Sequence, residues 1–190
     1  MRTVYVVGVP GSGKTTLVNA ALKLLDLRPV TEAIAPIPHV RHGTLWHLGR
    51  HRDPFGGTDT LAMNIQPKAI RWVLSLGINE HVLDPADVAE HVPSVLLGEG
   101  DRLANPAFFE ACPNLTVVHL DTPYVEARNR ASIRARATGN KPQDESWWKG
   151  RVTKVNNLVN SRRTLRLDGT QPVAENATVL AELLCGEACQ

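Results

Sequence analysis

The stretch GVPGSGKT at residues 8–15 decides the fold of this 190-residue chain. It matches the pattern G-x-x-x-x-G-K-[S/T], in which glycines let backbone N–H groups turn inward around the oxygens of a polyphosphate. An apolar, β-branched segment, TVYVV at residues 3–7, precedes it directly. Apolar residues three and four apart follow from Leu17 to Leu25, as in a helix that packs on a sheet. The order strand, loop, helix predicts a loop that binds a nucleoside triphosphate.

Two side chains of this stretch have chemical roles of their own. We expect Lys14 to reach the β- and γ-phosphates of ATP, and the Thr15 hydroxyl to bind Mg²⁺. The N-terminus of the helix adds positive potential at the same place, and Thr16 is expected near the α-phosphate. The residues expected to hold ATP and Mg²⁺ are Gly8, Pro10, Gly11, Ser12, Gly13, Lys14, Thr15 and Thr16.

Strands and helices are expected to alternate along the rest of the chain. The expected strands are residues 3–7, 44–48, 94–97, 115–120 and 164–167. The expected helices begin at residue 14, span residues 60–76 with a kink at Pro67, 84–91, 105–111, 124–136 and 147–160, and end the chain from about residue 173. Residues 29–43 contain three prolines and have no clear assignment. The alternation predicts an α/β fold with parallel strands joined by right-handed crossovers.

Length and composition set the class of protein. With 190 residues, 43% of them hydrophobic, and no linker-like segment, we expect one globular domain over residues 1–190. No apolar run approaches the ~18 residues of a membrane span, so no membrane partner is expected. Cys112, Cys185 and Cys189 have no metal or redox spacing and are expected to be free thiols. These features indicate a cytoplasmic protein.

The charge is distributed unevenly along the chain. Residues 128–166 hold eleven Arg and Lys but two acids, whereas the remainder holds ten basic and seventeen acidic residues, and the net charge is only +2. We interpret residues 128–155 as a lid whose cations surround the transferring phosphate, with Arg128 and Arg134 as the contacts. A surface that meets a polyanion is a second interpretation, and a solvated charged helix is a third.

Two carboxylates follow the third expected strand. Glu99 and Asp101 end it, and Arg102 comes directly after them. Ligands of open parallel sheets bind beyond the carboxyl ends of the strands, so both acids are expected at the mouth of the phosphate loop. One carboxylate, with Asp101 preferred, would hold Mg²⁺ together with Thr15, and the other would accept the proton of an acceptor hydroxyl. Arg102 would bind a phosphate, unless the segment is only a surface turn with an ion pair.

Several segments resemble thymidylate kinases. Besides GVPGSGKTT, these are HRDPFGGT at residues 51–58, which is similar to their T-R-E-P-G-G-T segment with Phe55 inserted, the pair Asp101-Arg102, LDTPYVEARNR and LDGTQPVAENATVL. The resemblance implies a P-loop NTPase three-layer sandwich with a five-stranded parallel sheet of order 2-3-1-4-5 and a helical lid. It also implies that Arg52 and Asp53 lie near the acceptor, and that residues 169–172 border the adenine.

Three further segments, FGGTDTLAMNIQPKA, GEGDRLAN and WWKGRVTKVNNLV, resemble a branch of bacteriophage kinases that includes 5-hydroxymethyluracil DNA kinases. That branch implies transfer of the γ-phosphoryl group of ATP to the base hydroxymethyl in phage DNA, in the host cytoplasm. Gln66 would then hydrogen-bond the pyrimidine edge, and Trp147 and Trp148 would stack on or brace an extruded base. Two alternatives remain open: a thymidylate-like nucleotide kinase, and a nucleotide-binding switch ATPase without a kinase activity.

Overall fold

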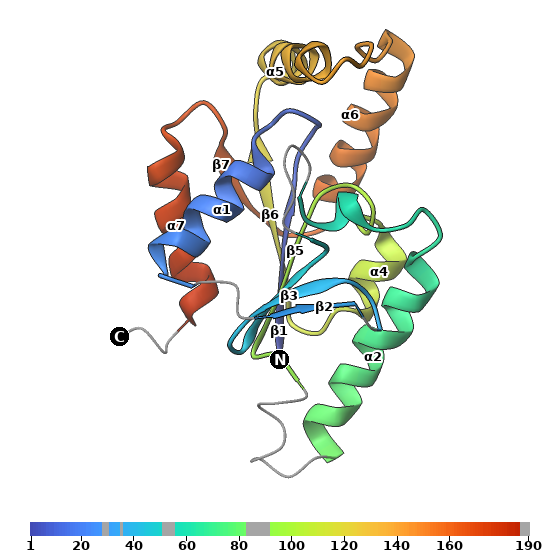
Figure 1. Ribbon diagram of the computed structural model, residues 1–190, viewed down its shortest axis with the longest axis vertical. Coiled ribbons are helices and arrows are strands. Elements are labelled where there is room, and N and C mark those ends of the chain that lie inside the picture. Colours follow the sequence, from blue (N-terminus) through green and yellow to red (C-terminus); the bar gives the residue numbers. More distant parts are fainter. Residues whose placement is uncertain (28–30, 35, 51–55, 83–91, 187–190) are drawn as a thin grey trace.

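The computed structural model describes residues 1–27, 31–34, 36–50, 56–82 and 92–186 (Figure 1). Within them, five parallel strands form the centre of the sheet in the order β4-β5-β1-β6-β7. These strands are β1 (Arg2–Val7), β4 (Leu45–Leu48), β5 (Val95–Glu99), β6 (Leu115–Asp121) and β7 (Thr164–Asp168). Counted along the chain, this is the order 2-3-1-4-5 that the resemblance implies, so the α/β fold and the order are confirmed.

The expected number of five strands is wrong, because the sheet has seven. The strands β2 (Thr31–Ala33) and β3 (His39–His42) extend it antiparallel beside β4. They come from the segment without a clear assignment. The sequence HVRH of β3 lacks the alternation of apolar and polar residues that marks a strand, yet His39 and His42 are both buried. The helix expected at residues 84–91 lies outside the described residues.

Helices cover both faces of the sheet (Figure 1). One face packs against α1 (Lys14–Leu24) and α7 (Val173–Cys185), and the other against α2 (Gln66–Val82) and α4 (Pro106–Ala111). Two more helices, α5 (Tyr124–Ala137) and α6 (Glu145–Asn160), project beyond the carboxyl ends of the strands. They contain the segment interpreted as a lid. No helix in the described ranges is long and apolar enough to cross a membrane.

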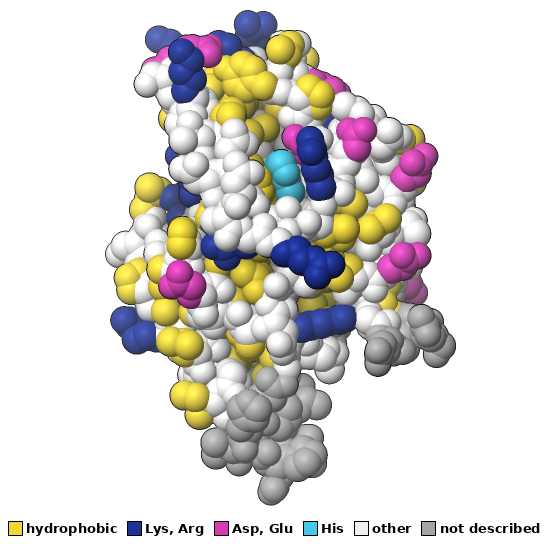
Figure 2. All heavy atoms as spheres, turned by 180° about the vertical axis from the view of Figure 1, so that it is seen from behind, with side chains coloured by type: hydrophobic (Ala, Val, Ile, Leu, Met, Phe, Trp, Pro, Cys, Tyr) yellow, Lys and Arg dark blue, Asp and Glu magenta, His cyan; other side chains and the backbone are white. Residues whose placement is uncertain are grey.

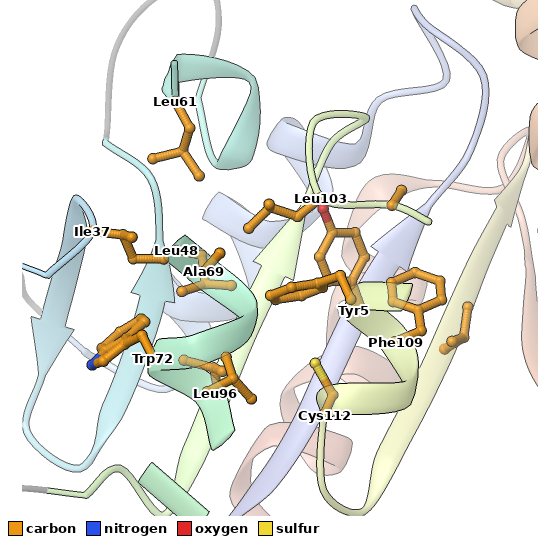
Figure 3. Packing of buried hydrophobic residues seen from close by; sticks show 14 of the residues in the cluster. Tyr5, Ile37, Leu48, Leu61, Ala69, Trp72, Leu96, Leu103, Phe109 and Cys112 are labelled. Carbon is orange, nitrogen blue, oxygen red and sulfur yellow. The ribbon is translucent and has the colours of Figure 1, made fainter. Parts of the chain in front are cut away.

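Successive side chains of β1 point to opposite faces of the sheet and belong to two separate cores. Val4 and Val6 pack into the cluster under α1 and α7, whereas Tyr5 and Val7 face the opposite cluster under α2 and α4. Figure 3 shows Tyr5 close to Phe109 in this second cluster, and the two rings meet edge to face at 5.0 Å. The Tyr5 hydroxyl contacts the Thr58 hydroxyl at 2.9 Å and donates to the Gly100 carbonyl at 3.2 Å. A buried tyrosine in the core thereby fixes two loops that border the carboxyl edge of the sheet.

The helix after the GGTD segment begins later than expected. Residues Thr58–Thr60 form a short 3-10 helix, η1, and the Thr60 hydroxyl donates to the Gly57 carbonyl at 2.8 Å. The helix α2 starts at Gln66, so Pro67 lies in its first turn rather than at a kink. Proline fits there because the first N–H groups of a helix have no partner within it. Residues 60–65, which were expected to begin the helix, therefore precede it.

The cysteines differ from one another, and the expectation of three free thiols is wrong for Cys185, which is disulfide-bonded. Cys112 is a free thiol in the core, where burial raises its pKa to about 12. Because the thiolate is the reactive form, we expect Cys112 to resist iodoacetamide at pH 8 in the folded protein and to be alkylated in urea. Peptide mass spectrometry measures both. Alkylation at equal rates in the two states would contradict this burial.

Candidate active site

A cleft of about 950 Å³ lies at the carboxyl ends of β1 and β5, between the phosphate loop, η1 and the two lid helices. Its walls come from segments far apart in the sequence. The residues that line it include Gly11, Lys14, Thr15, Asp59, Glu99, Asp101, Arg102, Arg134, Trp147, Arg151 and Lys154. This position is where ligands bind in open parallel sheets.

The phosphate loop is held in shape by glycines and by the lid. Gly11 and Gly13 have φ values of 81° and 100°, which side chains rarely adopt. A Cβ atom at Gly11 would lie 2.1 Å from the carbonyl oxygen of Ala127 in α5, and 3.1 Å from the Cβ of Ala131. The loop therefore lies directly against the first half of α5, and only glycine fits at this position.

Lys14 lies at the centre of the loop. Its ammonium group donates to the carbonyl oxygens of Gly8 and Val9 at 2.9 and 3.0 Å. Burial lowers the pKa of Lys14, and the negative charge of Glu99 acts in the opposite direction. A cation that is largely removed from water interacts strongly with a nearby phosphate, since the effective dielectric is low. The contact expected between Lys14 and the β- and γ-phosphates stays a prediction.

Glu99 and Thr15 form the second part of the site. The Thr15 hydroxyl donates to the Glu99 carboxylate at 2.9 Å, and Glu99 is only 1% exposed. Gly57 lies so close that a Cβ atom there would be 2.4 Å from the same carboxylate oxygen. Mg²⁺ prefers oxygen ligands and is usually bound through one or two protein groups plus water and phosphates. The hydroxyl and the carboxylate fit such an ion, and in this structure Glu99, rather than the preferred Asp101, contacts Thr15.

The buried position of Glu99 predicts a pH dependence of metal binding. Burial raises the pKa of Glu99 above its ordinary 4.5, whereas Lys14 and the Thr15 hydrogen bond lower it. As pH falls through this raised pKa, the carboxylate is protonated and loses its affinity for Mg²⁺. We expect calorimetry to show weaker Mg²⁺-ADP binding as pH is lowered toward 5, with a flat and weaker profile for Glu99→Gln. ADP without Mg²⁺ is the control, and an equal pH dependence there would contradict the assignment.

Asp101 is engaged by the lid. It forms ion pairs with Arg151 and Lys154 of α6, and the Lys154 ammonium also donates to the Asp101 backbone carbonyl at 2.9 Å. Its two carboxylate oxygens thus each accept from a lid cation. The roles expected for Asp101 in binding Mg²⁺ or accepting a proton stay predictions. In this arrangement Asp101 joins the end of β5 to the lid.

The expected arginine contacts occupy different positions. Arg134 lines the cleft. Arg128 instead pairs with Glu145 and donates to the Tyr124 hydroxyl at 3.2 Å, so it braces the junction between α5 and α6. Arg102 lines the cleft and donates to the Met63 sulfur, and its buried Nε has no partner among the described residues.

Of the three residues expected to contact the acceptor, only Gln66 lies in the described part of the chain. Arg52 and Asp53 lie outside the described residues. Gln66 donates to the Asn105 side-chain oxygen at 3.0 Å, and the same oxygen accepts from the Phe108 N–H at the start of α4. Gln66 therefore supports a helix cap in this structure, and its expected contact with a pyrimidine stays a prediction.

The two tryptophans of α6 have different surroundings. Trp148 is 1% exposed and meets Tyr124 and Trp147 edge to face, at 5.8 and 5.4 Å between ring centres. Trp147 is half-buried and lines the cleft, and the Arg151 guanidinium lies over its ring at 5.1 Å. Trp148 joins the two lid helices and also borders the cleft, and Trp147 is the more exposed of the two rings there.

Sequence reasoning missed Asp59 and Asn19 as cleft residues. Asn19 lies one helical turn after Thr15 on α1, so helical spacing from the phosphate loop was a usable signal. Asp59 follows directly after the GGT segment. Its carboxylate accepts from the Asp101 N–H at 2.7 Å, a contact that spans 42 residues of sequence. Only the folded sheet reveals that pairing.

Comparisons with solved structures support the fold. An unliganded sugar kinase from Janibacter sp. HTCC2649 is 19% identical, with a TM-score of 0.50 over 97% of this chain and 94% of that one. A gluconokinase from Sinorhizobium meliloti 1021 is 18% identical, with a TM-score of 0.46 over 96% of this chain and 95% of that one. A deoxyadenosine kinase from M. mycoides with bound dATP is 12% identical, with a TM-score of 0.47 over 97% of this chain and 100% of that one. At 19% identity, the likeness to the sugar kinase shows the fold alone. No curated protein matches the sequence.

The family is shown by the sequence itself. A family model described as P-loop Nucleotide Kinase3 matches residues 1–176, which include the phosphate loop, the acids at the end of β5 and the whole lid. The chain is thus a kinase, and it belongs to the P-loop Nucleotide Kinase3 family.

Proposed function

We propose that this kinase transfers the γ-phosphoryl group of ATP to the hydroxymethyl group of 5-hydroxymethyluracil in DNA. The observation that carries the proposal is the composition of the cleft. Lys14, Thr15 and Glu99 would form its triphosphate end, and Trp147, Arg151 and Lys154 line it from α6. An aromatic ring beside two cations suits a base that is still attached to phosphates.

The residues divide the chemistry between them. The P-loop N–H groups and Lys14 bind the triphosphate, and Arg134 approaches the transferring group from the lid. When bound by Thr15 and Glu99, Mg²⁺ would neutralise charge on the phosphate oxygens. The acceptor oxygen attacks the γ-phosphorus in line, the bond from that phosphorus to the β–γ bridging oxygen breaks, and ADP leaves. The lid excludes water, which would otherwise compete as the acceptor.

The choice of a DNA acceptor rests on the sequence resemblance and on the cleft, rather than on a continuous basic surface. Figure 2 shows the face opposite to that of Figure 1, where basic side chains lie apart from one another among hydrophobic and uncharged groups. Some basic residues of the lid are also paired internally, as Arg128 is with Glu145 and Arg130 with Glu126. This arrangement is consistent with a few contacts to the DNA phosphates that lie beside the target base.

One assay tests the proposal. Labelled ATP is incubated with thymidylate, with unmodified duplex DNA, and with the same DNA containing 5-hydroxymethyluracil. Label on the modified DNA alone supports the proposed acceptor. Label on thymidylate would replace it with a nucleotide kinase activity, for which Arg151 and Lys154 supply cations for an acceptor phosphate. Release of phosphate with no labelled acceptor would contradict both.

A further inference from the structure

Three carboxylates line the cleft in the described residues, Asp59, Glu99 and Asp101, and two of them are engaged. Glu99 is buried and accepts from the Thr15 hydroxyl, beside the position that suits Mg²⁺. Both oxygens of Asp101 accept from cations of α6. Burial limits the access of an acceptor to Glu99, and each oxygen of Asp101 already has a cationic partner.

Asp59 differs from both. It is exposed, and one of its oxygens, Oδ1, accepts from the Asp101 N–H at 2.7 Å. Its Oδ2 atom has no hydrogen-bond or ion-pair partner within the part of the chain that the structure describes. Among the described cleft carboxylates, Asp59 is therefore the exposed one, and it has an oxygen that can accept from an acceptor hydroxyl.

The position of Asp59 is fixed by the core rather than by the lid. The neighbouring Thr58 is fully buried, and its hydroxyl donates to the Glu99 carbonyl at 2.8 Å. Gly100 has a φ of 107°, and a Cβ atom there would lie 2.9 Å from the Asp59 carboxyl carbon. The carboxylate thus lies against the end of β5, and these contacts do not involve the lid helices.

We infer that Asp59 is the catalytic carboxylate that receives the acceptor hydroxyl. This inference rests on the proposed phosphoryl transfer. The Oδ2 atom of Asp59 accepts a hydrogen bond from the hydroxyl, and takes its proton as the bond from oxygen to the γ-phosphorus forms. The bond from that phosphorus to the bridging oxygen breaks, and its electron pair leaves with ADP. Asp101 then acts as the contact that joins the lid to the end of β5.

The negative charge of Asp59 acts on the pKa values of Lys14 and Glu99, two residues of the triphosphate end. Burial is the main cause of the lowered pKa of Lys14 and of the raised pKa of Glu99. Beyond burial, the negative charge of Asp59 raises the pKa of each of them. The carboxylate therefore lies within electrostatic range of the site where phosphate and metal would be bound, as an acceptor-orienting group requires.

Asp59→Asn is a sharp test, because an asparagine keeps a side-chain oxygen that can accept from the Asp101 N–H. Only the charge and the free acceptor oxygen are lost. We expect kcat for transfer to 5-hydroxymethyluracil DNA to fall about 10²- to 10⁴-fold. The Kd for Mg²⁺-ADP should stay within about twofold, because the lost interaction is made only during transfer. Asp26→Asn is the matched control, since Asp26 is exposed at the end of α1, with a φ of 50° that asparagine tolerates.

The slow hydrolysis of ATP, in which water is the acceptor, is measured alongside. If the wild-type protein labels no modified DNA, the proposed acceptor fails, and hydrolysis, in which water supplies the O–H group, still reports on Asp59. Three outcomes overturn the inference. They are a kcat of Asp59→Asn within about tenfold of wild type, a loss of Mg²⁺-ADP affinity that accounts for the lost rate, and a larger fall in kcat for Asp101→Asn than for Asp59→Asn.

Discussion

Replacing Lys14 by alanine is expected to lower kcat for phosphoryl transfer by at least about 10²- to 10³-fold, the effect of removing one preorganised charge donor. Its ammonium is buried and held by the carbonyls of Gly8 and Val9, so it is already at the phosphate site before substrate arrives. No other cation of α1 can replace it, because Lys23 lies more than two turns further along that helix. Steady-state transfer of labelled phosphate measures the effect.

Lys23→Ala is the control for this prediction, since Lys23 is an exposed lysine of the same helix. It should retain the wild-type rate and melting temperature. Lys14→Ala must also be shown to fold, by circular dichroism, before its rate is compared. A folded Lys14→Ala variant with near wild-type transfer would remove the phosphate loop from the mechanism.

Trp148→Ala is expected to destabilise the protein by about 3–5 kcal/mol, as for other large aromatic residues in a core. Trp148 is 1% exposed and lies between the two lid helices, where its ring meets Tyr124 and Trp147. Removing the ring leaves a cavity between α5 and α6, at the place where Trp148 packs against Tyr124. The melting temperature should fall by about 10 °C for a chain of this length.

Trp147→Ala and Trp148→Phe are the matched comparisons. Trp147 is only half-buried, so its removal should cost much less stability while weakening binding at the cleft. Trp148→Phe keeps an aromatic ring and removes a buried N–H that has no partner among the described residues, so it should lose less than alanine does. Thermal unfolding followed by circular dichroism distinguishes them. Equal losses for Trp147→Ala and Trp148→Ala would contradict the packing described here.

The parts of the fold that local sequence signals specify were predictable. The segment from β1 through the phosphate loop into α1 combines a β-branched run, a glycine motif and helical periodicity, and all three agree. The same holds for β6 and α5, where an apolar strand ends at Asp121 and a helix begins after Pro123. Parallel order then follows from the alternation of the elements.

The remainder depended on contacts between distant segments. The strand β3 buries His39, whose imidazole stacks on Trp46 at 5.0 Å, so a polar residue fills a core position that hydropathy assigns to solvent. The roles of Asp59 and Asp101 depend on which cations fold over them, and Arg151 and Lys154 come from about fifty residues away. A sequence motif identifies the acids but not their partners.

The contact between Gly11 and α5 limits how this enzyme can be redesigned. The Ala127 carbonyl lies where a side chain at position 11 would be. Any redesign must therefore keep the phosphate loop and the first half of α5 as a matched pair. Swapping lids between homologues, or building combinatorial libraries for new acceptors, should therefore leave residues 124–131 untouched. Diversity is better introduced from Ser132 onward, where residues that line the cleft lie beyond this contact with the loop.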